Sequence, residues 1–307
     1  MNKVICIVGP TASGKSSLGI SLAKEINGEI ISADSMQIYK GLDIGSGKVT
    51  KSEMDGVKHH MIDICSVNEN FSAFDYKILC YNKIEEIIKK GKTPIIVGGT
   101  GLYISSVVLN YGFIENKVDS KYREELYELA NKFGNEYLHN MLKELDFESS
   151  EEIHFNNTKR VVRALEMIKL NVTKSKHIET ENLRKNSLDN NYKFEVFCLK
   201  IGKDILDEKI NKRVDFMMDN GLENEAKEVY KVEECTAKQA IGYKEFFKYF
   251  EKRKTLEEVV EEIKLRTRQY AKRQITWFKK IPNVVFLDGL FTKEKLIEEI
   301  KRKIYEK

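Results

Sequence analysis

The sequence predicts an α/β fold, in which a parallel sheet is flanked by helices and the chain carries one helical insert. Before residue 118, short apolar runs that suit buried strands alternate with amphipathic helical stretches. From residue 118 to 169 the pattern is helical only, and a strand-like run follows at 194–201. The 307 residues suffice for one large domain or two ordinary ones. We expect a main domain of residues 1–115 and 192–307 and an insert of residues 116–191.

Residues 9–16 complete the G-x-x-x-x-G-K-[ST] pattern of nucleotide- and ATP-binding P-loops, between a predicted strand at 3–8 and a predicted helix at 17–26. Glycines let the backbone curl so that its N–H groups point inward, and the helix N-terminus adds partial positive charge. Lys15 supplies a full charge, and the Ser16 hydroxyl can bind Mg²⁺. The loop predicts a phosphate ligand on a P-loop NTPase-like fold, but it does not identify what the phosphates are attached to.

The other elements follow in order along the chain. After the loop we expect a strand, a short strand, an amphipathic helix and a buried strand, at 29–33, 60–64, 75–89 and 93–97. The insert should contain three helices, at 122–132, 136–145 and 158–170. The chain then returns through a strand, three helices, a last strand and a closing helix, at 194–201, 204–220, 223–232, 256–279, 284–287 and 293–305. Because the carboxyl ends of parallel strands meet at one edge, the ligand should lie where the phosphate loop meets residues 34–37 and 98–101.

Bulk properties exclude several classes of protein. The five cysteines are scattered and form no C-x-x-C pair, so neither a disulfide framework nor a zinc site is indicated. No apolar run is long enough to span a membrane, and the first strand leaves no room for a signal peptide, so a cytoplasmic location is expected. The net charge of +4 is too small to argue for nucleic-acid binding. However, cations concentrate at 263–280, where no acidic residue follows Glu262 until Asp288.

Asp34 is the first carboxylate at the expected ligand edge, directly after a predicted strand. It suits a general base that faces the phosphate loop, a Mg²⁺ ligand, or an Asx turn that closes the strand. The glycine-rich segment 98–103 suits either close approach of the backbone to a ligand or a plain tight turn into a helix. His59 and His60 point in different directions and have no carboxylate at ligand spacing in the sequence, so we favour a structural role for at least one.

The predicted helix at 256–279 interleaves basic and aromatic side chains. Its core-facing stripe is predicted to contain Leu256, Val259, Val260, Ile263 and Tyr270. The cations on its other faces suit either a solvated surface or contacts with a nucleic-acid backbone. Residues 159–163 form a second basic group, in the insert, whereas Arg213 considered alone suits a solvated helix surface.

Eight segments, taken together, resemble one family, the tRNA dimethylallyltransferases or tRNA isopentenyltransferases. They lie at 9–16, 31–45, 59–64, 97–103, 159–166, 210–214, 239–245 and 266–278. The resemblance spans nearly the whole chain in the family's order, which makes it very specific. The chain departs from the family where Thr-Ala-Lys-Pro is usual, having Ser46, Gly47, Lys48 and Val49, and where Asn171 replaces a usual glycine. These departures concern loop shape and leave the implied reacting groups intact.

The resemblance implies transfer of a dimethylallyl group from dimethylallyl diphosphate to N6 of adenosine 37 in tRNAs that read UNN codons, with release of diphosphate. It implies that Asp34 is the general base, that Arg213 clamps the diphosphate and that Thr100 positions base and donor. Diphosphate would bind Gly9, Thr11, Ala12, Ser13, Gly14, Lys15 and Ser16, with Mg²⁺ on Ser16. The tRNA anticodon stem-loop would contact Asp34, Ser35, Met36, Gln37, Thr100, Arg123, Lys159, Arg160, Val161, Val162, Arg163, Arg268, Lys272 and Arg273, those in 116–191 belonging to the insert.

Other functional classes remain open at this stage. An isopentenyltransferase that acts on free adenine nucleotides would not need the basic helix. A P-loop nucleotide kinase would have lid arginines, which cannot be assigned here. A non-catalytic RNA-binding module would not need Lys15, Ser16 and Asp34 on one rim. Under the favoured interpretation the partners are tRNA and dimethylallyl diphosphate, no membrane is involved, and a monomer is expected.

Overall fold

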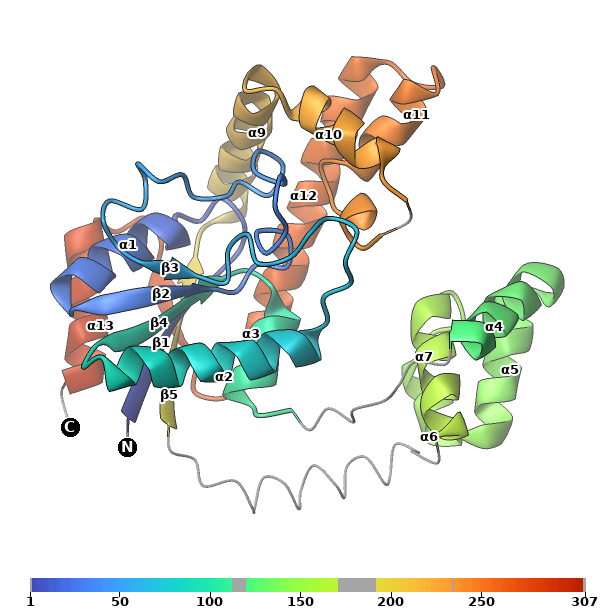
Figure 1. The fold of residues 1–307 in the computed structure, drawn as a ribbon, viewed down its shortest axis with the longest axis horizontal. Coiled ribbons are helices and arrows are strands. Elements are labelled where there is room, and N and C mark those ends of the chain that lie inside the picture. The colour runs from blue at the N-terminus through green and yellow to red at the C-terminus, as the bar shows by residue number, and fades with distance from the viewer. Residues whose placement is uncertain (1, 112–119, 171–191, 234, 306–307) are drawn as a thin grey trace. The chain divides into compact units, whose positions relative to one another are not determined.

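The computed structural model describes residues 2–111, 120–170, 192–233 and 235–305 (Figure 1). Its contacts divide the chain into two compact units, Met1–Leu109 with Asn190–Lys307 and Asn110–Asp189. The predicted domain boundaries fall in or beside 112–119 and 171–191, which lie outside the described residues, so they remain predictions. No helix in the described ranges is long and apolar enough to cross a bilayer.

The larger unit is built on a sheet of six parallel strands in the order β3-β2-β4-β1-β5-β6. The strands, in chain order, are β1 (Asn2–Val8), β2 (Gly28–Ser32), β3 (His59–His60), β4 (Thr93–Gly98), β5 (Tyr192–Lys200) and β6 (Val285–Asp288). The apolar runs predicted as strands are buried on both faces, as expected for a parallel sheet covered by helices. Strand β1 pairs with β4 in a register that places Val8 opposite Gly98. The phosphate loop and the glycine-rich segment therefore leave the sheet side by side.

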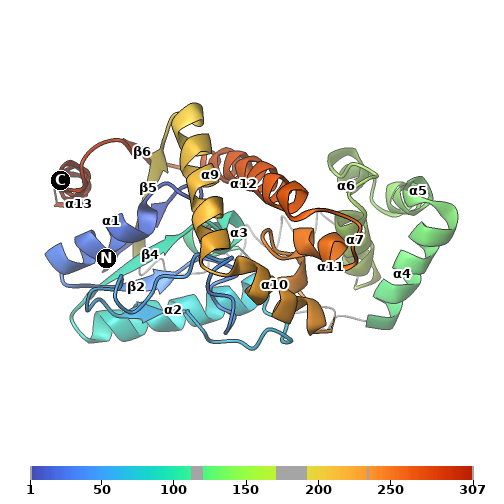
Figure 2. The same ribbon diagram turned by 90° about the horizontal axis from the view of Figure 1, so that it is seen from above.

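Two helical layers cover this sheet (Figures 1 and 2). One face packs against α2 (Ala73–Lys89), α3 (Gly101–Val108) and the last turn of α12 (Leu256–Phe278). The other face packs against α1 (Lys15–Glu25) and α13 (Lys293–Tyr305). Reciprocal hydrogen bonds between Ser72 and Asp75, and between Thr255 and Glu258, satisfy the first amides of α2 and α12 and define where these helices begin.

A third core lies beyond the carboxyl edge of the sheet and is made mostly of helices. It joins residues of the segment after β2 to α9 (Lys203–Asp219), α10 (Leu222–Lys231) and α12. Short helical segments complete it at Ala237–Gln239, Lys244–Phe246 and α11 (Phe247–Phe250). This core holds the chain segments that face the strand ends.

The described part of the smaller unit, residues 120–170, is a cluster of four helices with its own hydrophobic core. Its helices are α4 (Ser120–Phe133), α5 (Asn135–Leu145), α6 (Phe147–Glu152) and α7 (Thr158–Lys169). Leu126, Leu138, Leu142 and Leu165 are at most 1% exposed and form the centre of that core. The short helix α6 was not predicted, because its sequence is polar and only one side, at Ser150, is buried.

Two local expectations were wrong, and one open alternative is resolved. The strand predicted at 60–64 ends at His60, because Met61 and Asp63 adopt φ values of +63° and +55° that a strand cannot accommodate. After the fourth predicted strand, the turn into a helix that the sequence left open at 98–103 is present, as α3. On α12, Tyr270 is only partly buried, and the buried positions in that half of the helix are Ala271, Gln274 and Phe278.

Glu29, at the start of β2, is 2% exposed, forms ion pairs with Lys90 and Lys92, and contacts His60. Its carboxylate accepts hydrogen bonds from Lys92 Nζ at 2.8 Å and His60 Nε2 at 2.7 Å. Burial alone would raise the pKa of Glu29, but the hydrogen bonds from Lys92 and His60 outweigh it and lower that pKa from 4.5 to about 2. This contact agrees with the structural role favoured for one of the two histidines.

We expect Glu29→Gln to lower the free energy of unfolding at neutral pH by about 1–3 kcal/mol, because it removes a buried acceptor of charge-assisted hydrogen bonds. The folded pKa lies below the unfolded one, so this stabilisation is present above about pH 4.5 and is lost as the pH falls toward 2. Urea unfolding over that range should show the difference between wild type and variant shrinking. Glu25→Gln, at an exposed pair with Lys301, is the control. A difference that stays constant with pH would contradict the assignment.

Candidate active site

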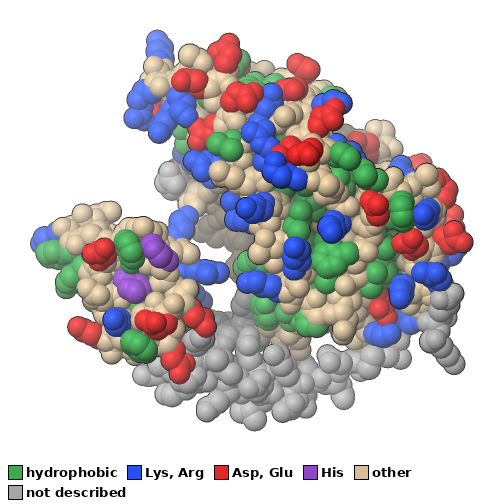
Figure 3. Space-filling model, turned by 180° about the vertical axis from the view of Figure 1, so that it is seen from behind, with side chains coloured by type: hydrophobic (Ala, Val, Ile, Leu, Met, Phe, Trp, Pro, Cys, Tyr) green, Lys and Arg blue, Asp and Glu red, His purple; other side chains and the backbone are tan. Residues whose placement is uncertain are grey.

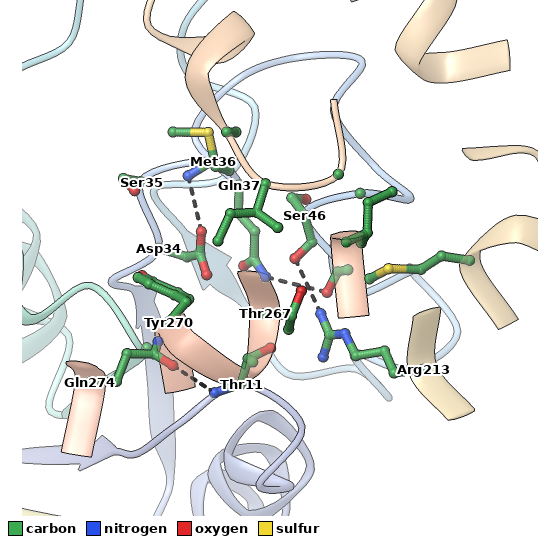
Figure 4. A pocket seen from close by; sticks show the side chains of 18 of the residues that line it. Thr11, Asp34, Ser35, Met36, Gln37, Ser46, Arg213, Thr267, Tyr270 and Gln274 are labelled. Carbon is green, nitrogen blue, oxygen red and sulfur yellow. Dashed lines mark hydrogen bonds between the residues drawn. The ribbon is translucent and has the colours of Figure 1, made fainter. Parts of the chain in front are cut away.

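A cavity of about 330 Å³ lies at the carboxyl ends of β1, β2 and β4 (Figure 4). Nine of the residues predicted from the sequence line it: Thr11, Lys15, Ser16, Asp34, Ser35, Met36, Gln37, Arg213 and Arg273. The remaining lining residues come from the end of β4 (97–98), from the segment 45–47, from 239–242 and 244, from α9 and from α12. All of the lining residues belong to the larger unit.

The phosphate loop has the curled backbone that its pattern predicts. Gly9, Ala12 and Gly14 all have positive φ, and α1 begins directly after Gly14. Ser13 is 3% exposed, and its buried hydroxyl has no hydrogen-bond partner among the described residues. This hydroxyl has no accessible surface and Ser13 does not line the cavity, so it is not placed to meet a ligand in this structure. Gly9, Ala12, Ser13 and Gly14 do not line the cavity through side chains, so their predicted part in binding rests on this backbone geometry.

The predicted binding of diphosphate by Thr11 needs a correction, because Gln274 already binds the main chain of Thr11. The Oε1 atom of Gln274 accepts the backbone N–H of Thr11 at 2.9 Å (Figure 4). Its Nε2 donates to the carbonyl of Gly99 at 2.9 Å. The amide of Thr11 is therefore already satisfied by the protein, leaving its side chain on the cavity wall. The side chain of Gln274 ties α12 to both glycine-rich segments at the strand ends.

Lys15 and Arg213 place two cations in this cavity. Burial, followed by the positive charge of Arg213, lowers the pKa of Lys15 from 10.5 to about 8, while Asp34 and Cys198 act in the opposite direction. Burial also lowers the pKa of Arg213, against the nearby Asp34. Lys15 donates to the carbonyl of Pro10 at 3.3 Å and Arg213 to that of Ser46 at 3.4 Å. Two desolvated cations held by main-chain carbonyls would be strongly stabilised by a multiply charged anion.

Asp34, on the loop after β2, also lines the cavity. Its Oδ1 accepts the backbone N–H of Met36 at 2.9 Å, which is the Asx turn that the sequence left open (Figure 4). The turn uses one carboxylate oxygen, so it is compatible with a general base that acts through the other. Thr100 is not among the lining residues. Its Oγ1 accepts the backbone N–H of Ser35 at 2.9 Å. In this structure Thr100 therefore helps to fix the loop that carries Asp34.

Two glycines at the site are required by close contacts. A Cβ on Gly98 would stand 2.2 Å from the carbonyl oxygen of Ala33, so β2 and β4 could not pair as closely. A Cβ on Gly47, whose φ is +57°, would stand 1.8 Å from Nη2 of Arg213. Gly47 occupies a position where the resembled family usually has alanine. In this chain the guanidinium of Arg213 uses the space that a methyl group would fill.

The face of α12 toward the cavity was not predicted from the sequence. Ile263, Thr267, Tyr270 and Gln274 recur at helical spacing and all line the cavity. The pKa of Tyr270 is raised to about 12 by burial and by Asp34, while side-chain hydrogen bonds with Thr100 and Gln274 oppose the shift. The sequence pattern from which this face could have been predicted is a mixed stripe of apolar and hydrogen-bonding residues on one side of the helix. The segment 239–242 also lines the cavity, and its sequence carried no chemical signal of its own.

The residues of the insert that were predicted to contact RNA differ in burial and in their side-chain contacts. Val161 and Val162 are 0% and 1% exposed in the core of the insert, so the prediction that they contact RNA cannot apply to their side chains. Arg123 donates to Glu166 at 2.6 Å, and Arg163 pairs with the same carboxylate at 3.2 Å. Residues 159–160 are exposed at the start of α7.

On α12 the cations have unequal environments. Arg268 donates to Asn211 Oδ1 at 2.6 Å, and not to the acidic residues one or two turns earlier on its own helix. Lys272 is exposed, whereas Arg273 lies over the ring of Tyr270, with 5.7 Å from Cζ to the ring centroid, and lines the cavity. In Figure 3, lysine and arginine side chains follow one another down the middle of one face of the larger unit.

The lowered pKa of Lys15 predicts how anion binding depends on pH. Because the amine loses its charge as the pH rises through about 8, we expect the affinity for inorganic diphosphate to fall above that value. The fall should approach about tenfold per pH unit well above the pKa. Lys15→Met should bind diphosphate weakly and lack this component, and it corrects for the titration of the ligand itself. Calorimetry between about pH 7 and pH 10 measures both. Parallel pH profiles for the two proteins would contradict the assignment.

Comparison with known proteins supports the family that these features resemble. The family model described as IPP transferase matches residues 37–281. A tRNA dimethylallyltransferase of Bacillus anthracis is 47% identical over 288 residues, which cover 93% of this chain and 90% of that protein. A solved tRNA isopentenylpyrophosphate transferase from Bacillus halodurans has a TM-score of 0.73 and 41% identity, with 99% of this chain and 96% of that chain covered.

A second solved structure, a eukaryotic dimethylallyltransferase acting on tRNA, has a TM-score of 0.78 and 29% identity, with 99% of this chain and 80% of that chain covered. The similarity therefore extends over nearly the whole chain and includes the residues that line the cavity. Sequence and structure lead to the same assignment. The chain belongs to the IPP transferase family, the family of the tRNA dimethylallyltransferases.

Proposed function

We propose that this protein transfers the dimethylallyl group of dimethylallyl diphosphate to N6 of adenosine 37 in tRNAs that read UNN codons. The observation that carries this proposal is the composition of one cavity. Two desolvated cations, Lys15 and Arg213, line it together with the carboxylate of Asp34, which follows β2. Such a cavity suits a diphosphate leaving group beside a weakly acidic nucleophile.

The proposed reaction breaks one bond and forms one. The allylic C–O bond to diphosphate breaks, and its electron pair leaves with the diphosphate, whose growing charge is stabilised by Lys15 and Arg213. A bond forms between adenine N6 and the allylic carbon. Adenine N6 is a poor nucleophile because its lone pair is delocalised into the ring. Asp34 accepts the N6 proton and thereby orients that lone pair.

The rest of the cavity is suited to the two uncharged reacting groups. Met36, Val214, Met217, Ile241 and Ile263 provide apolar wall that a dimethylallyl tail requires. Tyr270 offers a ring face beside Asp34 on which a base can stack. To enter, adenosine 37 would leave the stack of the anticodon loop, at a cost of about a few kcal/mol.

The residues present also fit a Mg²⁺ ion. The Ser16 hydroxyl lines the cavity next to Lys15, where it can act as a metal ligand. The described residues contain no group of three or more His, Cys, Asp or Glu side chains that could hold a metal by themselves. This suits a Mg²⁺ ion that is held mainly by substrate phosphates and water. When bound, the ion would neutralise part of the diphosphate charge.

For recognition of tRNA, we propose that the exposed cations of α12 and the start of α7 contact the phosphate backbone. Lys272 in the larger unit and residues 159–160 in the smaller are exposed cations suited to this. We further propose that the insert binds the anticodon stem-loop, and that the protein acts in the cytoplasm as a monomer. The family and the eukaryotic relative acting on tRNA support this reading of the basic residues.

One assay tests the function against its competitors. The protein is incubated with isotopically labelled dimethylallyl diphosphate and either an anticodon stem-loop, free AMP, or no acceptor. Label in the stem-loop alone is expected. Label in AMP alone would indicate an enzyme for free adenine nucleotides. ATP hydrolysis coupled stoichiometrically to turnover would favour a kinase, and tRNA binding without transfer would favour a non-catalytic RNA-binding module.

We predict that Asp34→Asn slows single-turnover transfer by about 10²–10⁴-fold, the usual contribution of a general base. Asparagine retains an oxygen that can accept the N–H of Met36, so the loop should be preserved. Binding of the stem-loop should remain nearly unchanged, which filter binding measures. Asp219→Asn, at an exposed carboxylate at the end of α9, controls for loss of charge. A near-normal single-turnover rate in Asp34→Asn would exclude its assignment as the base.

We predict that neutralising Arg268, Lys272 and Arg273 together weakens tRNA binding and flattens its salt dependence. Each lost phosphate contact should reduce the slope of log affinity against log salt by about 0.7–0.9. Lys272 is expected to contribute most to the slope, because Arg268 is held by Asn211. The charge-matched control neutralises three exposed lysines of α13, Lys293, Lys295 and Lys303. Equal slopes for wild type and the α12 variant would eliminate this helix as an RNA surface.

A further inference from the structure

Glu225 of α10 makes an unusual set of contacts with the loop at 43–45. Its carboxylate accepts hydrogen bonds from three successive backbone amides, those of Asp43, Ile44 and Gly45, each with an oxygen within 2.9 Å. It also accepts the hydroxyl of Tyr243 at 2.7 Å. Charge-assisted hydrogen bonds of this kind are the stronger ones, and a main-chain amide that loses its partner is costly. The side chain of Glu225 therefore holds two segments in place, the loop at 43–45 and the segment that contains Tyr243.

Each of these segments continues directly into the cavity wall. After Gly45, the carbonyl of Ser46 accepts from Arg213 at 3.4 Å and the carbonyl of Gly47 accepts from Gln37 at 3.3 Å. The neighbours of Tyr243, residues 239–242 and 244, also line the cavity. Glu225 itself does not line it.

The contact between the two segments is close. A Cβ on Gly45 would stand 2.7 Å from the hydroxyl of Tyr243, so the loop can approach the tyrosine only because residue 45 is glycine. The tyrosine ring is fully buried, and burial together with Glu225 raises the pKa of its hydroxyl. The hydroxyl thus remains a donor to Glu225. The loop position is set by the hydrogen bonds of Glu225 and by this close packing.

We propose that Glu225 is a positioning residue for the donor diphosphate, acting through the Ser46 carbonyl on the guanidinium of Arg213. The proposal rests on the proposed function only for the identity of the diphosphate's organic group. Without the carboxylate, the amides of 43–45 lose their acceptor, the Ser46 carbonyl moves, and Arg213 loses its orientation toward the anion. Asp34 and the phosphate loop lie on other segments and stay in place.

The test compares Glu225→Gln with Glu228→Gln, which removes an exposed carboxylate from the same helix. In Glu225→Gln one oxygen becomes an amide N–H that faces the donors of the loop. We expect the KM for dimethylallyl diphosphate and the Kd for inorganic diphosphate to rise by about tenfold or more, with the KM for the stem-loop within about twofold of wild type. Hydrogen exchange at 43–45 should accelerate. Glu228→Gln should match wild type in each measurement.

A double-mutant cycle separates positioning from a general loss of structure. In an Arg213→Ala background, Glu225→Gln should weaken diphosphate binding by less than about twofold, because the group through which it acts is absent. An undiminished effect there, or a diphosphate Kd unchanged by Glu225→Gln in the wild-type background, would overturn the proposal. If Glu225→Gln fails to fold, Tyr243→Phe removes one donor and should raise the same Kd by a smaller factor. The binding measurement needs no transfer activity, so a failure of the proposed function would be seen separately.

Discussion

The parallel pairing of β1 with β4 is the constraint on which the site depends. Because both strands run in the same direction and Val8 stands opposite Gly98, the phosphate loop and the glycine-rich segment emerge together. Strand β2 pairs with β4 on its other side, with Ser32 opposite Val97, which brings Asp34 to the same edge. Close approach at this edge requires Gly98, since any side chain there would collide with the Ala33 carbonyl. Residues from three distant parts of the sequence therefore converge through main-chain hydrogen bonds.

The electrostatics of the site follow from what is packed over this edge. The sheet supplies Lys15 and Asp34, but the second cation, Arg213, comes from α9 in the separate core beyond the strand ends. Burial of these cations lowers their pKa values, a cost that an unliganded protein bears continuously. A bound anion with several charges would remove that cost. The proposed diphosphate ligand would therefore stabilise the site, and discrimination between organic groups would come from the remaining walls.

Polar side chains that bridge elements hold these walls in place. Gln274 joins α12 to the phosphate loop and to Gly99, and Glu225 joins α10 to the loop at 43–45 and to Tyr243. Each bridge satisfies main-chain groups that no regular secondary structure would satisfy. Loss of such a bridge should disturb one wall and leave the sheet intact, because the hydrophobic cores on the two sheet faces do not include these residues.

The sequence by itself determined the α/β class, nearly every strand and long helix, and the phosphate loop, because each depends on local patterns of apolar residues and glycine. It also identified Lys15, Ser16, Asp34 and, through family resemblance, Arg213. Only the tertiary structure showed that Val161 and Val162 are core residues, that Arg268 is bonded to Asn211, and that the Thr11 amide is occupied by Gln274. The last two facts depend on partners 57 and 263 residues apart, so no local pattern encodes them. The neighbours that a side chain meets are decided by packing between elements.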